Sequence, residues 1–194
     1  MATTLVAGTV ASVPALAHYC EAMSLRTLVV MRHAKAEQAG PSDYERPLSQ
    51  RGHRDAAAVG GWLADQGFVP DEVLVSAALR TRETWEHVRR GAGDSWSGPA
   101  ASYDRGLYAA GVDTALDLVR RVEESCERLL VIGHNPTVAL LAHLLDDGEG
   151  DTAAANELAL GFPTSATAVF AHPGSWADLA PGAARLSGHH VGRG

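Results

Sequence analysis

The amino-acid sequence predicts an α/β fold, a three-layer sandwich around a mostly parallel central sheet. Short apolar runs rich in β-branched residues alternate along the chain with longer segments whose apolar residues recur at helical spacing. The last part of the chain changes to short alternating pieces, which are typical of antiparallel edge strands. With 194 residues, the chain is long enough for one domain with a real core.

The first strand and the first helix are separated by a long polar segment. Residues 25–31 (LRTLVVM) are apolar and rich in β-branched residues, so we expect a buried strand. Residues 32–47 are polar and have the character of a functional loop. Ser49 then suits the N-cap of a helix that runs to about Gln66.

A second strand is predicted over residues 72–76, and it leads into a helix from about Leu79 to Arg90. Residues 91–102 are rich in Gly, Ser and Pro and are expected to be loop. A third helix is predicted over residues 112–124.

The clearest strand covers residues 128–132 (RLLVI). Asn135 and Pro136 suit the N-cap and first-turn positions of the next helix, which should end near Leu145. Beyond Gly161 we expect antiparallel edge strands in three pieces, at residues 166–171, 175–179 and 184–188.

Composition narrows the classes of function. The chain is 46% apolar and 20% charged, as in ordinary soluble proteins, and its net charge is −7. Such an acidic balance argues against nucleic-acid binding. Cys20 and Cys126 are far apart in the sequence, which disfavours a disulfide framework or a thiolate metal site and indicates reduced cytosolic thiols.

The N-terminal segment is set apart from the rest of the chain. Residues 1–22 are apolar but contain no basic residue, so they do not match a secretory signal, and their apolar run is too short to span a bilayer. We expect either a disordered accessory arm or an artefact of start-site choice. The functional domain is placed at residues 23–194, with no membrane association and a cytoplasmic location.

Three predicted apolar strands are each followed, at the carboxyl end, by an arginine or a histidine. The first is followed by Arg32 and His33, the second by a segment ending in Arg80, and the strand at 128–132 by His134. Ligands of open α/β sheets bind at this edge, so we expect the four side chains to converge. Each residue alone has a simpler structural explanation, as a solvated or ion-paired group or a turn residue. The combination favours a site.

These residue types suit phosphoryl transfer. Guanidinium forks match the oxygens of a phosphoryl group, and a neutral imidazole is a competent nucleophile. A second imidazole, if protonated, would add another donor. Arginine and histidine together neutralise the charge that Mg²⁺ would otherwise meet, so no metal or other cofactor is expected.

The ordered motifs MRHAKAE, ERPLSQRG, SAALRTRET and VIGHNP resemble the histidine phosphatase superfamily, and most closely its small SixA-type phosphohistidine phosphatase branch. The tail segments GFPTSATAV and WADLAPGAA also fit that branch. The resemblance implies a phosphoglycerate mutase-like fold without a cap domain. It also implies that His33 is the nucleophile, that Arg32 and Arg80 bind phosphate, and that His134 is the second histidine of the pocket. Arg82 would point away from the site.

The departures from the family pattern bear on the substrate. Ala34 replaces a common glycine, and Asn135 stands where the phytase-like branch has an acidic proton donor. Asp104 is only a poor match to the mutase-like acid. Without a clear general acid to protonate the leaving group, the enzyme should prefer substrates whose leaving group departs readily. Phosphohistidine on a phosphorelay protein is such a substrate.

Three alternatives stay open. One is a small-molecule phosphomonoesterase of the same superfamily that acts on sugar or nucleotide phosphates. Another is a protein that binds phosphate without turnover, although the intact His33 and His134 count against it. A third is metal binding through His189 and His190, whose spacing is poor for a zinc site.

Overall fold

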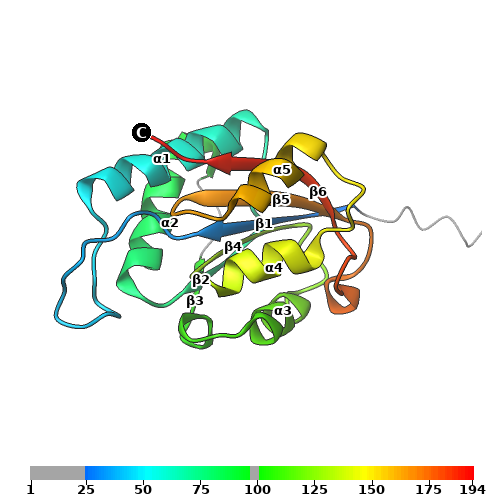
Figure 1. The fold of residues 1–194 in the computed structure, drawn as a ribbon, viewed down its shortest axis with the longest axis horizontal. Helices are drawn as coiled ribbons and strands as arrows, with labels where there is room; N and C mark the ends of the chain where they lie inside the picture. Colours follow the sequence, from blue (N-terminus) through cyan, green and yellow to red (C-terminus); the bar gives the residue numbers. More distant parts are fainter. Residues whose placement is uncertain (1–24, 97–100) are drawn as a thin grey trace, which may run out of the picture.

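The computed structural model describes residues 25–96 and 101–194. Figure 1 shows a central sheet with helices on both faces, which confirms the predicted α/β sandwich. The sheet has the strand order β3-β2-β4-β1-β5-β6. Its strands are β1 (Arg26–Arg32), β2 (Glu72–Ser76), β3 (Ala101–Asp104), β4 (Arg128–Gly133), β5 (Ala166–His172) and β6 (Arg185–Val191). Strands β3, β2, β4 and β1 are parallel, whereas β5 is antiparallel to both β1 and β6.

In the described part of the chain, two α-helices cover one face of the sheet, and three cover the other. The first pair is α1 (Gln50–Asp65) and α2 (Leu79–Ala92). The second group is α3 (Val112–Arg120), α4 (Thr137–Leu145) and α5 (Thr152–Leu160). Side chains that alternate along β1 and β4 enter one core or the other, and residues 28–31 and 129–132 are fully buried. This two-sided burial explains why both strands are apolar without interruption.

Local capping accounts for the start of α1 but corrects the expectation for α4. The Ser49 hydroxyl accepts a hydrogen bond from the amide of Gly52, as expected of an N-cap. Helix α4 begins only at Thr137, with Pro136 in the capping position. Asn135 does not cap it, because its side-chain amide donates to the carbonyl of Phe162 at 2.8 Å. The asparagine therefore ties two loops together.

The segment predicted as loop over residues 91–102 contains more structure than expected. Helix α2 continues to Ala92, and a 3₁₀ turn follows at Gly93–Trp96, where Trp96 is buried. Strand β3 then pairs with β2 alone, as the outermost strand of the sheet. A four-residue edge strand with partly exposed side chains has no clear sequence pattern.

The carboxyl-terminal part also differs in detail from the prediction. The piece at 175–179 contains a 3₁₀ turn, Trp176–Asp178, capped by the Ser175 hydroxyl, and not a strand. Strand β5 lies inside the sheet, so only β6 is an edge strand there. Helix α5 was not predicted, and α3 ends at Arg120, before the expected 124.

The predicted arm at residues 1–22 and Cys20 lie outside the described residues. Cys126 is a buried free thiol, and burial raises its pKa to about 11. Among the described residues, no helix combines the length and apolarity needed to cross a membrane.

Candidate active site

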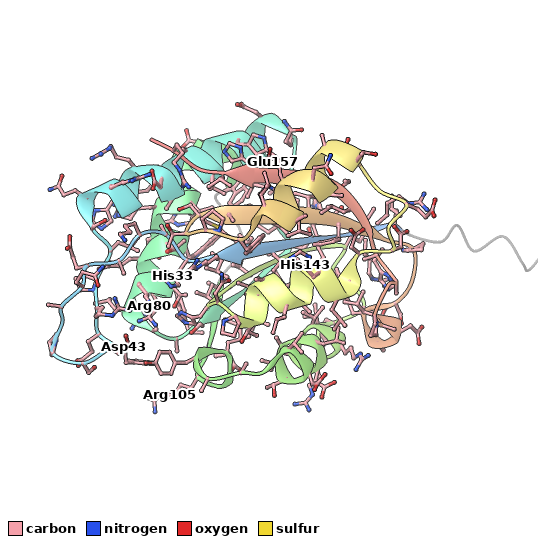
Figure 2. The ribbon with its side chains drawn as sticks, in the orientation of Figure 1. His33, Asp43, Arg80, Arg105, His143 and Glu157 are labelled. Carbon is pink, nitrogen blue, oxygen red and sulfur yellow. The ribbon has the colours of Figure 1, made fainter. Side chains whose placement is uncertain are left out.

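The parallel order β2-β4-β1 brings three strand ends to one edge of the sheet. Arg32 is the last residue of β1 and pairs with Gly133, the last residue of β4. His33 and His134 follow directly, and their ring centroids lie 5.1 Å apart. Arg80 stands in the first turn of α2, just after β2. Figure 2 shows His33 and Arg80 near each other at this end of the sheet.

Main-chain contacts orient the His33 ring. Its Nδ1 lies 2.7 Å from the carbonyl oxygen of Ala34. A carbonyl can only accept, so Nδ1 carries the hydrogen and Nε2 keeps its lone pair. The amide of Ala34 donates to the Thr84 hydroxyl at 3.0 Å, which holds the backbone of this residue on its amide side as well. His33 therefore has the tautomer that a nucleophilic Nε2 requires.

Both imidazoles are neutral at physiological pH. Burial, together with the nearby charges of Arg80, Arg32 and Arg46, lowers the pKa of His33 to about 4, although the hydrogen bond to Ala34 acts in the opposite direction. Burial likewise lowers the pKa of His134 to about 3, with His33 and Arg80 acting in the same direction. A protonated second histidine, the case considered from the sequence, is therefore absent from the free enzyme at neutral pH.

The two arginines are partly used by the protein itself. Arg32 donates from Nη1 to the carbonyl of Phe162 at 3.0 Å. Arg80 donates from Nη1 to the carbonyl of Asp43 at 2.6 Å, and from Nη2 to the Asp43 carboxylate at 3.2 Å. The fork expected to face phosphate is thus shared with Asp43.

The candidate site contains buried polar atoms without hydrogen-bond partners among the described residues. Within residues 25–96 and 101–194, three such atoms belong to the predicted quartet: Nε of Arg32, Nε of Arg80 and Nδ1 of His134. A buried nitrogen without a hydrogen-bond partner is costly and calls for an explanation. An anion that accepts hydrogen bonds from all three nitrogens would explain why they have no partner within the described part of the protein.

Asp43 and Tyr108 belong to this region but were not predicted. The Tyr108 hydroxyl donates to the Asp43 carboxylate at 2.7 Å, and the Arg80 guanidinium lies over the Tyr108 ring, 5.7 Å from its centroid. The hydrogen bond from Tyr108, with Arg80 and Arg46 nearby, lowers the pKa of Asp43 to about 2. Asp43 is therefore ionised and cannot donate a proton at neutral pH.

The comparisons with known proteins agree with this geometry. Residues 28–107 match the family model described as the histidine phosphatase superfamily (branch 1). The phosphohistidine phosphatase SixA of Escherichia coli is 31% identical over 129 residues, covering 62% of this chain and 74% of that protein. The chain belongs to the histidine phosphatase superfamily.

Further relatives extend the match over most of this histidine phosphatase. An uncharacterized protein of Mycobacterium tuberculosis is 42% identical over 165 residues, which cover 84% of this chain and all of the relative. A solved structure from Nakamurella multipartitia, assigned as a phosphohistidine phosphatase SixA, has a TM-score of 0.75 and 34% identity. It covers 87% of this chain and 96% of that one. The chain is thus an enzyme, a SixA-like phosphatase with a phosphorylated substrate.

The remaining candidates of the sequence contact residues outside the quartet. Asp104 accepts a hydrogen bond from the amide of Leu107 through Oδ1 and so caps a turn of this histidine phosphatase. Arg82 is exposed and lies over Tyr103. His190 stacks on Trp62, and His189 contacts Phe162. In the described part of the chain, no three His, Cys, Asp or Glu side chains form a group that could hold a metal ion.

The pH dependence of this histidine phosphatase should reflect its neutral imidazoles. With its pKa near 4, the His33 imidazole stays unprotonated down to about pH 5. We therefore expect the enzyme's contribution to kcat/KM to fall only below this pH. The measurement is a kcat/KM profile on two substrates of different phosphate pKa, because an acid limb common to both belongs to the enzyme. A common limb centred near pH 6.5 would contradict this assignment.

The same shift affects stability. The unfolded chain has ordinary histidines, so it binds protons before the folded state does as the pH falls. The free energy of unfolding should therefore be retained above about pH 6.5 and decrease between there and about pH 3, the lower of the two folded-state pKa values. Denaturant unfolding at several pH values measures this decrease.

Proposed function

We propose that this histidine phosphatase removes the phosphoryl group from phosphohistidine on a phosphorelay protein, through a covalent intermediate on His33. The observation that carries the proposal is the set of three unpartnered buried nitrogens of Arg32, Arg80 and His134, beside an Nε2 of His33 that keeps its lone pair. This arrangement offers donors to the oxygens and a nucleophile to the phosphorus of one group.

The reaction proceeds in two transfers. In the first, the lone pair of His33 Nε2 forms a bond to phosphorus, while the bond from phosphorus to the substrate's imidazole nitrogen breaks. The other nitrogen of the substrate ring carries a hydrogen in the reacting form, so the electron pair of the broken bond stays on the leaving nitrogen and the ring departs as a neutral imidazole. In the second, a water oxygen attacks phosphorus, the bond to Nε2 breaks, and a proton passes to solvent as inorganic phosphate forms. Arg32, Arg80 and His134 hold the oxygens throughout.

The state of the carboxyl groups of Asp43 and Asp104 favours a substrate whose leaving group needs no proton donor. An alkyl phosphate needs a general acid to protonate the leaving alkoxide, whereas an imidazole leaves much more readily. Asp43 is ionised, with its pKa near 2, and Asp104 caps a turn. Neither is suited to donate a proton. The SixA phosphohistidine phosphatase of Escherichia coli, which is similar to this chain, carries the same activity in its name.

The dependence on leaving group tests the proposed substrate. We expect kcat/KM to rise from glycerol phosphate to p-nitrophenyl phosphate, and to be highest for a phosphohistidine protein. Since a well-placed acid contributes about 10²–10⁴-fold, the difference between classes should be of that order. The Asp104→Asn variant is the control, and its rates should stay close to wild type. Equal rates on glycerol phosphate and phosphohistidine would instead support a phosphomonoesterase acting on small sugar or nucleotide phosphates.

A further inference from the structure

Ser76 contacts the second histidine of the site. It is the last residue of β2, it is fully buried, and its Oγ lies 2.7 Å from Nε2 of His134. Its carbonyl accepts a hydrogen bond from the Thr81 hydroxyl at 2.6 Å, which anchors the strand end to α2. The serine side chain is thus presented to the imidazole from a fixed backbone.

The direction of this hydrogen bond follows from the partners available. A hydroxyl can donate or accept, and a neutral imidazole has one nitrogen of each kind. If Nε2–H donated to Ser76, the serine hydrogen would have no acceptor among the described residues, since His134 is the one partner of Oγ there. If Ser76 donates to Nε2, both atoms are satisfied, and a buried Nδ1–H is the only group left over.

The resulting tautomer suits an anion. The oxygens of a phosphoryl group in its dianionic form are acceptors only, so a lone pair on Nδ1 would repel them, whereas an N–H attracts them. Nε of Arg32 and Nε of Arg80 are likewise buried donors without partners. We propose that Ser76 is a positioning residue that holds His134 in its Nδ1–H tautomer and thereby makes a neutral imidazole a hydrogen-bond donor to the phosphoryl group. This inference rests on the proposed binding of phosphate by His134.

Because His134 is neutral, its tautomer decides whether it can donate a hydrogen bond to phosphate. Since burial, His33 and Arg80 lower the pKa of His134 to about 3, a charged imidazolium is not available at neutral pH. The neutral imidazole of histidine in water favours the proton on Nε2, which is the opposite of what phosphate binding needs here. By donating to Nε2, the Ser76 hydroxyl favours the tautomer with the proton on Nδ1.

The first test determines the tautomer of His134 directly, by measuring the ¹⁵N chemical shifts of its ring in the intact free enzyme at neutral pH. The wild type should show a protonated Nδ1 and an unprotonated Nε2. Ser76→Ala should shift the ring toward a protonated Nε2, and Ser76→Thr, which keeps the hydroxyl, should restore the wild-type pattern. A protonated Nε2 in the wild type, or an unchanged spectrum in Ser76→Ala, would overturn the inference.

Phosphate affinity and turnover supply the functional arm. Ser76→Ala should weaken binding of inorganic phosphate and lower kcat/KM by about ten- to a hundredfold, as loss of a supporting hydrogen bond commonly does. Ser76→Thr should recover most of both. Unchanged phosphate binding and turnover in a folded Ser76→Ala enzyme would overturn the proposed role.

A matched pair at His134 tests the donor without changing Ser76. An asparagine amide nitrogen can occupy the place of Nδ1, and a glutamine amide nitrogen that of Nε2. We expect His134→Asn to retain at least about tenfold more kcat/KM than His134→Gln, the scale of one retained donor to the transferring group. Equal or reversed rates would count against an Nδ1–H donor.

Different experimental outcomes would contradict the proposed function and the proposed role of Ser76. If the wild type neither binds inorganic phosphate nor hydrolyses any phosphorylated substrate, the proposed function fails, whatever the spectrum shows. If the wild type turns over normally with a protonated Nε2 on His134, only the role of Ser76 fails.

Discussion

Replacing His33 with alanine is expected to lower turnover by at least about 10⁴-fold, the scale on which loss of a nucleophile acts. The bond to Ala34 leaves Nε2 of His33 as the nitrogen with a free lone pair, beside the donors of Arg80 and His134. Alanine offers no atom that could accept the phosphoryl group. The measurement is kcat/KM on a phosphohistidine protein, together with rapid quenching of the wild type to detect an acid-labile phosphoryl group on His33.

A histidine elsewhere provides the control for this experiment. His143 is exposed on α4, away from His33 and Arg80 in Figure 2, so His143→Ala should keep wild-type turnover. Circular dichroism of both variants checks that the fold is intact. Full activity in a folded His33→Ala enzyme, or a phosphorylated intermediate on another residue, would refute the covalent mechanism.

Arg80→Lys is expected to recover only part of the activity that Arg80→Ala loses. The loss in alanine should correspond to about 3–5 kcal/mol of transition-state stabilisation, in the range of an electrostatic clamp. Arg80 donates to Asp43 through both Nη atoms and has a further donor, the buried Nε. Lysine has a single ammonium nitrogen, which cannot hold Asp43 in that bidentate way and also meet phosphate at the position of Nε. Steady-state kinetics of the three enzymes measures the difference.

Arg82→Lys is the matched control on the same helix. Arg82 is exposed and lies over the ring of Tyr103, so its replacement should leave kcat/KM unchanged. Wild-type activity in Arg80→Lys would show that the guanidinium geometry is not needed. A loss in Arg82→Lys as large as that in Arg80→Lys would show that the effect does not depend on the guanidinium placed at position 80.

Much of the fold and the position of the quartet could be predicted because both depend on local sequence patterns. The buried strands 28–31 and 129–132 are continuous apolar runs, and His33 and His134 directly follow such strands. Parallel pairing then brings their ends together. Helix α5 and strand β3 were missed because their short sequences lack a strong period.

The partners of the quartet could not be predicted in the same way. Ser76 meets His134, and Tyr108 meets Asp43, across separations of 58 and 65 residues. Nothing in the residues around Asp43 distinguishes it from other polar residues of its loop. Its contact with Arg80 follows from how the segment between β1 and α1 folds over α2, and that path is set by tertiary packing.

The strand order also bears on how the protein folds. Strand β1 comes first among the described strands, yet its neighbours are β4, where Thr27 pairs with Arg128, and β5, where Arg26 pairs with His172. Such distant pairings raise the contact order, which slows folding because long loops must close before the strands meet. During synthesis, β1 must wait for most of the chain before either neighbour exists. Among the described strands, the one that leads to His33, the proposed nucleophile, therefore waits longest for its neighbours. Its apolar run is open to aggregation during that time.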